Sequence, residues 1–497
     1  MTHPNIIYIL VDDMGYGDVR SLNDGCAWPT PNLDRLANQG MTFTDAHSSS
    51  AVCTPSRYSI MTGRYCWRTT LKSNVIGGAG APLIAADRVT VAGLLKDAGY
   101  RTACFGKWHI GWDWAVKPGM EGVVDRDDWL GDNQDWIDFT RPVEGGPADH
   151  GFDEFFGIAG SLDMPPYVYV ENRQPLEIPT AWGTQDEFGR AGPRMRSLRA
   201  HNVLGTITDR AVDYIEAHDS ERPFFLYLPF TSPHTPIAPA PEFLGASGVS
   251  PYGDFCVETD ARVGQVLDAL DAKGIAEDTL VIFTSDNGCS RDPAQCDDLE
   301  KRYGHRASHI YRGYKSDIWD GGHRVPFLAR WPRVVAPGSV CDAPIGIFDL
   351  FATAAEITGQ APGPDAGEDS VSFLPGLTGG DFSTAAARPL IHHSIDGMFA
   401  IRKGDWKLCR CPGSGGWTYD DADARADGLP EIQLYHMGDD PAESDNTEAD
   451  QSALVSELTQ ELHRVVVGHE NDPSVAIEDW PQIVWRSELP KGFVLDD

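Results

Sequence analysis

The chain has 497 residues, 41% hydrophobic and 23% charged, a globular composition that excludes a disordered or fibrous protein. Lys and Arg total 40 and Asp and Glu total 74, so the formal net charge is −34, which repels nucleic acid and anionic membrane surfaces. No apolar run reaches the length of about 20 residues that a membrane span needs. Ten cysteines are too few for a disulfide scaffold in a chain of this length.

The N-terminal segment MTHPNIIYIL lacks the basic region, apolar region and cleavage site of a signal peptide. The sequence therefore favours a cytoplasmic protein if this N-terminus is native. It favours a periplasmic or secreted protein if a leader has been removed.

Short apolar runs alternate with helical patterns along most of the chain. Residues 5–11 (NIIYILV) predict a buried strand. A helix is expected next over 30–40, where Thr30 is the predicted N-cap and Pro31 the first helical residue. Further strands are predicted at 101–105, 224–230 and 279–284, and a further helix at 259–272. This alternation predicts an α/β domain in which a large, mostly parallel sheet is flanked by helices on both faces.

The composition changes near the C-terminus. Two segments rich in Gly, Pro and Ala, 358–369 and 377–389, are candidates for a domain boundary. Strand-like pieces in 390–410 and a helical pattern in 451–466 follow them. We therefore predict a large domain over 1–385 and a smaller C-terminal α+β domain with an antiparallel sheet over 386–497.

Polar residues follow each of the four predicted strands. In order, they are Asp12 and Asp13, then Lys107 and His109, then His234, then Asp286 and Asn287. Ligands of open α/β sheets bind at the carboxyl ends of the strands, so these residues are candidates for one site. At any one strand end alone, an ordinary polar turn is the better explanation, but polar groups at four strand ends together favour a site. The carboxylate and amide oxygens suit a hard cation, with Ca²⁺ favoured over Mg²⁺, and do not suit zinc.

Residues 50–64 (SAVCTPSRYSIMTGR) contain the second candidate feature. Thr54 is a predicted N-cap and Pro55 a predicted first helical residue, which places Cys53 just before a helix N-terminus. Such a terminus binds anions, and Arg57 would add a positive charge one turn further on. The alternative is a buried structural cysteine.

The segment CTPSR at 53–57, followed by TGR at 62–64, resembles the Cys-x-Pro-x-Arg signature of type I sulfatases, a family of the alkaline-phosphatase-like superfamily. The similarity is greatest to carbohydrate sulfatases of the arylsulfatase A and N-acetylgalactosamine-sulfatase type. Further segments resemble family motifs and occur in family order: VDDMGYGD at 11–18, GKWHIG at 106–111, GIAGSLD at 157–163, SPHTP at 232–236, SDNG at 285–288 and GYKSDIWDGGHRVP at 313–326.

The resemblance implies an alkaline-phosphatase-like fold and a chemistry for these residues. Cys53 would be oxidised to Cα-formylglycine by a maturation enzyme, and a hydroxyl of the aldehyde hydrate would attack sulfur. The implied metal ligands for Ca²⁺ are Asp12, Asp13, the modified residue 53 (Cys53 in the sequence), Asp286 and Asn287. The implied catalytic residues are Cys53, Arg57, Lys107, His109, His234, Lys315 and Ser161.

Several of these residues have implied roles. His234, with Lys315, would protonate the leaving alcohol, and His109 would be the base that expels sulfate from the enzyme. Asp286 is the implied base for the attack, besides ligating the metal. Lys107 and Lys315 would hold the sulfate oxygens.

The substrate is less well defined by the sequence. We expect a sulfated galactose or N-acetylgalactosamine of a glycosaminoglycan or algal polysaccharide. His305, Arg312 and Asp317, in the loop 303–319, are candidates to bind the sugar, although an ordinary polar loop explains them as well. Trp108, Trp112 and Trp114 could stack on sugar rings.

Two other functions are considered. A phosphonate or phosphate ester hydrolase of the same superfamily would use the same machinery. A non-catalytic carbohydrate-binding homologue would be expected to have lost Cys53 or the acidic residues, all of which are present.

Overall fold

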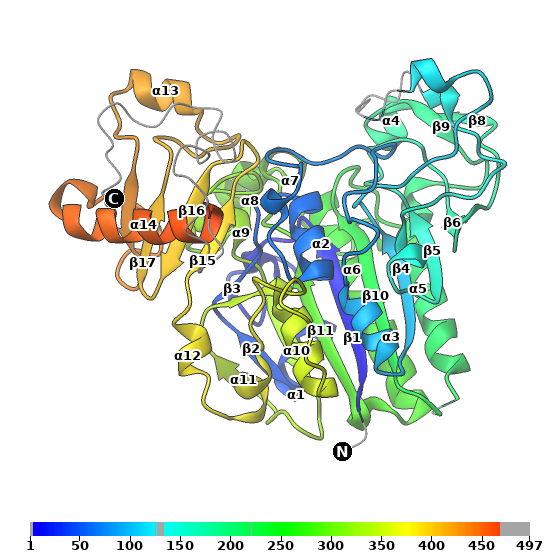
Figure 1. Cartoon of the computed structure of the whole chain (residues 1–497), viewed down its shortest axis with the longest axis horizontal. Helices are drawn as coiled ribbons and strands as arrows, with labels where there is room; N and C mark the ends of the chain where they lie inside the picture. The colour runs from blue at the N-terminus through cyan, green and yellow to red at the C-terminus, as the bar shows by residue number, and fades with distance from the viewer. Residues whose placement is uncertain (1–2, 125, 127–133, 220, 468–497) are drawn as a thin grey trace.

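The computed structural model describes residues 3–124, 126, 134–219 and 221–467. Its largest element is a ten-stranded sheet with the order β13-β2-β12-β11-β1-β10-β4-β5-β6-β7 (Figure 1). The strands are β1 (Asn5–Asp12), β2 (Met41–Phe43), β4 (Arg101–Lys107), β5 (Glu154–Ile158), β6 (Val170–Glu171), β7 (Gln174–Pro175), β10 (Phe224–Pro233), β11 (Thr279–Ser285), β12 (Phe327–Arg330) and β13 (Ser339–Cys341).

The five central strands, from β11 to β5, are parallel, and antiparallel strands lie on both sides of them. Every residue of β1, β10 and β11 is buried, as expected for continuously apolar strands covered on both faces. In the register, Tyr8 of β1 lies between Tyr227 of β10 and Ile282 of β11. The four predicted strands and the mostly parallel centre of the sheet are confirmed.

Two groups of helices cover the sheet. The first group comprises α1 (Pro31–Gln39), α5 (Ala200–Ala217) and α6 (Pro251–Lys273), which pack on one another and on the strands. The second comprises α2 (Cys53–Thr62), α3 (Val91–Asp97) and α10 (Leu350–Thr358), seen in front of the strands in Figure 1. The predicted helix at 30–40 is α1, and the one at 259–272 is the C-terminal part of the longer α6.

The N-terminus of α2 differs from the prediction. The helix begins at Cys53 itself, and Val52, in an extended conformation, is its N-cap in place of Thr54. Pro55 therefore lies at the third helical position. Proline is tolerated there because the first four N–H groups of a helix have no partner within the helix, so none is lost. Cys53 is thus the first residue of the helix.

A second, separate sheet of four antiparallel strands follows (Figure 1). Its strands are β15 (Leu390–His393), β16 (Phe399–Lys403), β17 (Trp406–Cys409) and β18 (Gln433–His436), and α14 (Ser452–Val467) packs on it. This agrees with the predicted α+β unit, whose expected part beyond residue 467 lies outside the described residues. The domain boundary between 385 and 386 stays a prediction.

The remaining short elements connect these units. They are β3 (Ala46–His47), β8 (Ala181–Gly183), β9 (Gly192–Arg194), β14 (Ile345–Gly346), α4 (Gln185–Phe188), α7 (Arg291–Ala294), α8 (Cys296–Tyr303), α9 (Asp320–His323), α11 (Leu374–Thr378), α12 (Ser383–Ala386) and α13 (Asp421–Ala426). Within the described ranges, no helix combines the length and the apolar character that a bilayer crossing requires. All ten cysteines are described, and all are free thiols.

Candidate active site

A pocket of about 360 Å³ opens at the carboxyl ends of the central strands. Asp13, Cys53, His234 and Lys315 line it, and each is no more than 7% exposed. Asp13 follows β1 and His234 follows β10. Cys53 is the first residue of α2, and Lys315 precedes α9, so the pocket is formed by segments that are far apart in the sequence. The structure thus brings the predicted strand-end residues to one place.

Cys53 lies within this polar surrounding at the first position of α2. Its Sγ is 3.5 Å from Asp12 Oδ1 and 3.6 Å from Lys315 Nζ. Burial raises the pKa of the Cys53 thiol well above its usual value, and the nearby Asp286 carboxylate acts in the same direction. The residue is therefore a neutral thiol at neutral pH, which is a poor nucleophile.

Asp12, the last residue of β1, and Asp13, which follows it, each bind a lysine. Lys107 Nζ donates to Asp12 Oδ2 at 2.7 Å, and Lys315 Nζ lies 2.7 Å from Asp13 Oδ1. Asp13 has a φ of 64°, a left-handed conformation that a buried non-glycine residue adopts only when its surroundings hold it there. Although burial alone would raise the pKa of Asp12, the charges of Lys107, His234 and Arg57 hold it well below its usual value. Asp12 is therefore ionised at neutral pH.

Asp286 and Arg57 form a buried ion pair beside the aspartates. The Nε and Nη2 atoms of Arg57 lie 2.9 Å and 2.8 Å from Asp286 Oδ2, and Nη1 donates to the carbonyl oxygen of Lys107 at 3.0 Å. The second oxygen of Asp286 accepts the N–H of Asp13 at 3.3 Å. Arg57 Nη2 also lies 3.5 Å from Asp12 Oδ1, so Arg57 links three of the four strand ends.

The oxygen-rich donor set fits a divalent cation. Asp12, Asp13, Cys53 and His234 each offer a ligand atom within 4.8 Å of the others. Asn287 donates through its amide nitrogen to Asp13 Oδ1 at 2.7 Å, while its Oδ1 is buried without a hydrogen-bond partner. An unpartnered buried oxygen beside ionised carboxylates is the group that a hard cation would satisfy.

Two further predicted residues, His109 and Ser161, are buried and do not line the pocket. His109 binds the carbonyl oxygen of Ile76 through Nε2 at 2.8 Å, and its Nδ1 is buried without a partner. Burial and the charges of Lys107 and Arg57 lower the pKa of His109 well below its usual value, so the ring is neutral and its Nδ1 can accept a hydrogen bond. Ser161 is buried, and its hydroxyl has no protein partner.

The three residues expected to bind the sugar do not line this pocket. His305 is fully buried and binds Asp18 at 2.9 Å. Arg312 stacks on Trp319, with its guanidinium carbon 3.6 Å from the ring centre. A role for them in substrate binding remains a prediction, and each already has partners within the fold.

Asp317 instead links the pocket to the second sheet. Its carboxylate accepts hydrogen bonds from the N–H and hydroxyl of Thr418, and the N–H of Trp417 donates to Ser316 Oγ at 3.0 Å. A Cβ on Gly416 would lie 2.5 Å from the carbonyl oxygen of Ser316, so only glycine permits this close approach. The loop that carries Trp417 is thereby held against the segment of Lys315.

The three tryptophans expected to stack on sugars are buried in the core. Trp108, Trp112 and Trp114 are at most 1% exposed, and Trp112 packs edge-to-face on Trp114. Trp417, in contrast, is 63% exposed and lines the pocket.

Other residues of the pocket wall were not predicted from the sequence. Among them are Asn74, Asp163, Arg190, Arg291 and Trp417. None of them lies at the end of a predicted strand or in a recognisable ligand spacing, so their position in the pocket becomes visible only in the structure.

Comparison with known proteins assigns the family. The sulfatase family model matches residues 4–360. An N-acetylgalactosamine-6-O-sulfatase of Bacteroides thetaiotaomicron is 32% identical over 503 residues, covering 93% of this chain and 93% of that protein. A solved structure from work on glycosaminoglycan metabolism by the same organism has a TM-score of 0.80 at 30% identity, covering 94% of this chain and 99% of the other.

A phosphonate monoester hydrolase from Silicibacter pomeroyi has a TM-score of 0.59 at 19% identity, covering 94% of this chain and 98% of the other, a similarity of fold alone. The match of the sulfatase family model and the 32% identity to a named sulfatase show that the chain belongs to the sulfatase family and is a sulfuric ester hydrolase. The predicted family and the predicted class of enzyme are confirmed.

Replacing Asp13 with Asn should remove the cation from the pocket. The change keeps the shape of the side chain but removes the charge that faces Lys315 and Asn287. We expect divalent-cation affinity to fall by at least about 100-fold, the upper end of the loss when groups that only orient a metal ligand are removed. Metal analysis of protein equilibrated with Ca²⁺ would measure this.

Asp292→Asn is the matched control, because Asp292 lines the same pocket but is exposed and lies outside the cluster of Asp12, Asp13, Cys53 and His234. Unchanged cation affinity in Asp13→Asn would remove Asp13 from the set of ligands.

Proposed function

We propose that the enzyme hydrolyses the 6-sulfate of an N-acetylgalactosamine or a closely similar sugar, using formylglycine made from Cys53 and a bound Ca²⁺. One observation carries the proposal: Cys53 lines the pocket with its Sγ 3.6 Å from Lys315 Nζ and 3.5 Å from Asp12, the carboxylate that also binds Lys107. The sulfatase that is 32% identical to the chain, and named for N-acetylgalactosamine 6-sulfate, supports the choice of sugar.

The state of Cys53 supports the modified residue. As a thiol it is neutral and buried, and sulfur is a poor ligand for the hard cation that the surrounding oxygens suit. A formylglycine hydrate would supply hydroxyl groups in its place, one as nucleophile and one to release the product. Maturation by a formylglycine-generating enzyme belongs to the same proposal.

The cation would be held by Asp12, Asp13, Asp286, Asn287 and residue 53, and when bound it would polarise the sulfate oxygens. Around it, Lys107 and Lys315 provide fixed positive charges at the place where negative charge increases in the transition state. Burial raises the pKa of the Asp286 carboxyl group, and the Arg57 guanidinium acts against that rise and holds the carboxyl group in position. His234 faces the pocket and would protonate the leaving oxygen, while the neutral His109 would accept a proton when sulfate is released.

The wall of the pocket can recognise a sugar. Asp163 binds Arg190 through Oδ2 at 2.8 Å, while its Oδ1 is buried without a hydrogen-bond partner. That oxygen is free to accept a hydrogen bond from a sugar hydroxyl. On another side, Trp417 presents an exposed ring, the kind of surface on which the apolar face of a galactose-type sugar packs.

Trp417→Ala should weaken the binding of a sugar sulfate more than that of sulfate alone. We expect KM for N-acetylgalactosamine 6-sulfate to rise about 2- to 10-fold, since an aromatic contact contributes about 0.5–1.5 kcal/mol. Trp417→Phe, which keeps a ring, should retain most of the affinity. The inhibition constant of inorganic sulfate should be the same for the wild type, Trp417→Ala and Trp417→Phe. An equal loss of affinity for inorganic sulfate in Trp417→Ala would show that the loop holds Lys315 and does not contact the sugar.

The function itself is tested by rates on a panel of substrates. The panel would contain 4- and 6-sulfates of N-acetylgalactosamine and galactose, glucosamine 6-sulfate, an aryl sulfate and an aryl phosphonate. The highest kcat/KM is expected for N-acetylgalactosamine 6-sulfate. A preference for the phosphonate would overturn the proposal, and a preference for another sulfated sugar would overturn the choice of substrate alone.

A further inference from the structure

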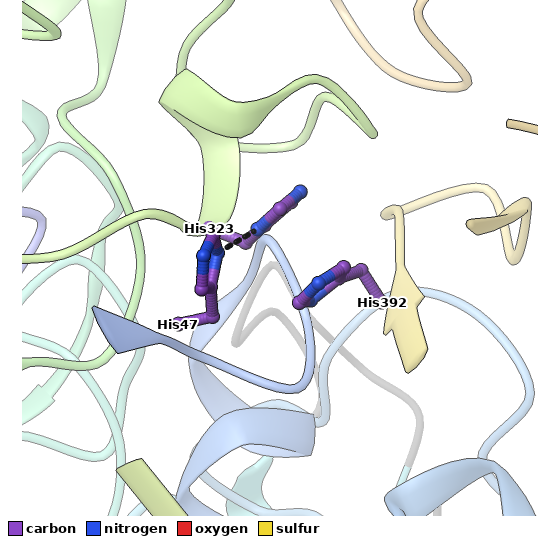
Figure 2. Close-up of side chains that lie close together, drawn as sticks. All are labelled: His47, His323 and His392. Atoms are coloured by element: carbon purple, nitrogen blue, oxygen red, sulfur yellow. Dashed lines mark hydrogen bonds between the residues drawn. The ribbon is translucent and has the colours of Figure 1, made fainter. Parts of the chain in front are cut away.

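Three histidines meet in the interior at the junction of the two sheets, away from Cys53. His47 belongs to β3, His323 ends α9 and His392 belongs to β15, so the cluster joins the large α/β unit to the second sheet (Figure 2). Each histidine is at most 1% exposed. None of them lines the active-site pocket.

One ring nitrogen of each histidine is close to an oxygen that can accept its proton. His47 Nε2 lies 2.7 Å from Asp45 Oδ1. His323 Nε2 lies 3.1 Å from the carbonyl oxygen of Ile318, and His392 Nδ1 lies 3.1 Å from that of Ser48. In metal-binding histidines the second nitrogen donates to a carboxylate or a carbonyl and orients the ring, and His323 reaches this arrangement when its proton is on Nε2.

Nitrogens of the three rings come close together. One nitrogen from each ring lies within 4.8 Å of one nitrogen from each of the others, His47 Nδ1 faces His323 Nδ1, and His392 Nε2 is buried without a hydrogen-bond partner. The two Nδ1 atoms are 3.1 Å apart. Two nitrogens bound to one tetrahedral Zn²⁺, each at about 2.0–2.1 Å, would be about 3.3 Å apart.

The ring positions agree with this geometry for two of the three pairs. The ring centre of His47 lies 5.2 Å from that of His323 and 5.0 Å from that of His392. Rings that share a tetrahedral zinc would be separated by about 5 Å. His323 and His392 are closer, stacked at 3.8 Å, so the His392 ring must move outward by about 1 Å and rotate to bind the same ion.

Charged side chains surround the cluster on every side. Asp45, Asp320 and Glu443 are negative, and Arg324, Arg402 and Lys407 are positive. Lys407 Nζ lies 3.1 Å from His323 Nε2 and 2.7 Å from both Asp320 Oδ1 and Glu443 Oε1. Without a metal, Lys407 donates to His323 Nε2, and His323 Nδ1–H donates to His47 Nδ1.

Metal binding changes one proton position and releases no proton. The proton of His323 moves from Nδ1 to Nε2, where it is donated to the Ile318 carbonyl oxygen, and Lys407 turns wholly to its two carboxylates. His47 keeps its proton on Nε2 and His392 keeps its proton on Nδ1. Burial lowers the pKa of all three rings below the usual value, so they are neutral and available as ligands.

We propose that His47, His323 and His392 bind a transition-metal ion such as Zn²⁺ at a site separate from the oxygen-lined cation site near Cys53. Imidazole nitrogen suits zinc and similar ions, and does not suit Ca²⁺ or Mg²⁺. The ion would tie the large unit to the second sheet. It would also hold the backbone at Ser48, five residues before Cys53, through the His392 hydrogen bond.

The experiment compares two adjacent histidines of β15. His392 and His393 are equally buried, and each has a ring nitrogen close to a backbone carbonyl oxygen, but only His392 belongs to the cluster. Because the site is closed to solvent, the wild type, His392→Gln and His393→Gln should be produced in zinc-supplemented medium, so that the metal is present during folding.

We expect one more zinc per chain in the wild type and in His393→Gln than in His392→Gln. Neither His392 nor His393 offers a ligand to the cation cluster near Cys53, so a difference in zinc content between the two variants reports the histidine cluster. Equal zinc content in the two variants, or none in the wild type, would show a hydrogen-bonded cluster only. If His392→Gln fails to fold, X-ray absorption spectroscopy of zinc in the wild type is the deciding measurement. A zinc coordination shell that lacks several imidazole nitrogens would overturn the proposed site.

Discussion

Replacing Cys53 with Ala should lower kcat on a sugar sulfate by about 10⁴-fold or more, as expected when the nucleophile of a covalent mechanism is removed. The remaining cations of the pocket would still bind sulfate, so KM should change far less than kcat. Steady-state kinetics at saturating substrate, with inorganic sulfate as a competitive inhibitor, would separate the two effects.

Cys53→Ser is the informative companion variant. A serine hydroxyl has the right size to attack sulfur, but it offers no second hydroxyl to expel the product. We therefore expect the variant to accumulate a stable sulfate ester on Ser and to stop after about one turnover. Intact-protein mass spectrometry would detect the added sulfate.

Peptide mass spectrometry of the wild type tests the premise of both variants. A fully active preparation should contain formylglycine in the peptide around residue 53. Full activity with only an unmodified thiol at that position would contradict the mechanism. The fraction modified should also follow the specific activity from one preparation to another.

Replacing His234 with Ala should have an effect that depends on the leaving group. A sugar alcohol needs a proton in the transition state, and the loss should be about 10²–10⁴-fold in kcat, the usual contribution of general acid–base catalysis. A nitrophenol leaves readily without a proton, so the loss on an aryl sulfate should be less than about tenfold. One ring nitrogen of His234 lies within 4.8 Å of Cys53 Sγ, close enough to reach the leaving oxygen.

His109→Ala serves as the comparison for His234→Ala. His109 would act after the alcohol has left, so its removal should slow turnover of the sugar sulfate and the aryl sulfate by similar factors. Both substrates must be saturating, because a histidine close to sulfate can also contribute binding. Equal losses on both substrates for His234→Ala would mean that His234 binds sulfate and does not protonate the leaving oxygen.

In the proposed function, substrate choice would depend on residues from both units of the structure. Asp163 and Arg190 come from the segment between β5 and α5, and Trp417 comes from the loop between β17 and β18. Because the Trp417 loop is hydrogen-bonded to Ser316 and Asp317, the second sheet can influence the position of Lys315 as well as the sugar. The proposed division of the chain at 385/386 therefore places the active site across two domains.

The sequence by itself determined the centre of the fold and the residues that meet at its edge. Continuous apolar runs such as 5–11 and 279–284 can be buried on both faces only as central parallel strands, and β1 and β11 are such strands. Parallel strands end at a common edge, so the positions of Asp12, Asp13, Asp286 and Asn287 side by side followed from the predicted sheet. The start of α2 was misplaced by two residues, because Pro55 was interpreted as the first helical residue when it is the third.

Only the tertiary structure decided what surrounds that edge. Trp108 and Trp417 are the same residue type, and no local pattern distinguishes the first, which is buried, from the second, which is exposed in the pocket. Asp317 has the chemistry of a sugar ligand, yet a contact with Thr418, from the second sheet's loop, uses its carboxylate. The histidine cluster likewise joins β3, α9 and β15, which are distant in sequence. Burial and partner choice depend on such long-range packing, which neither the spacing nor the identity of neighbouring residues encodes.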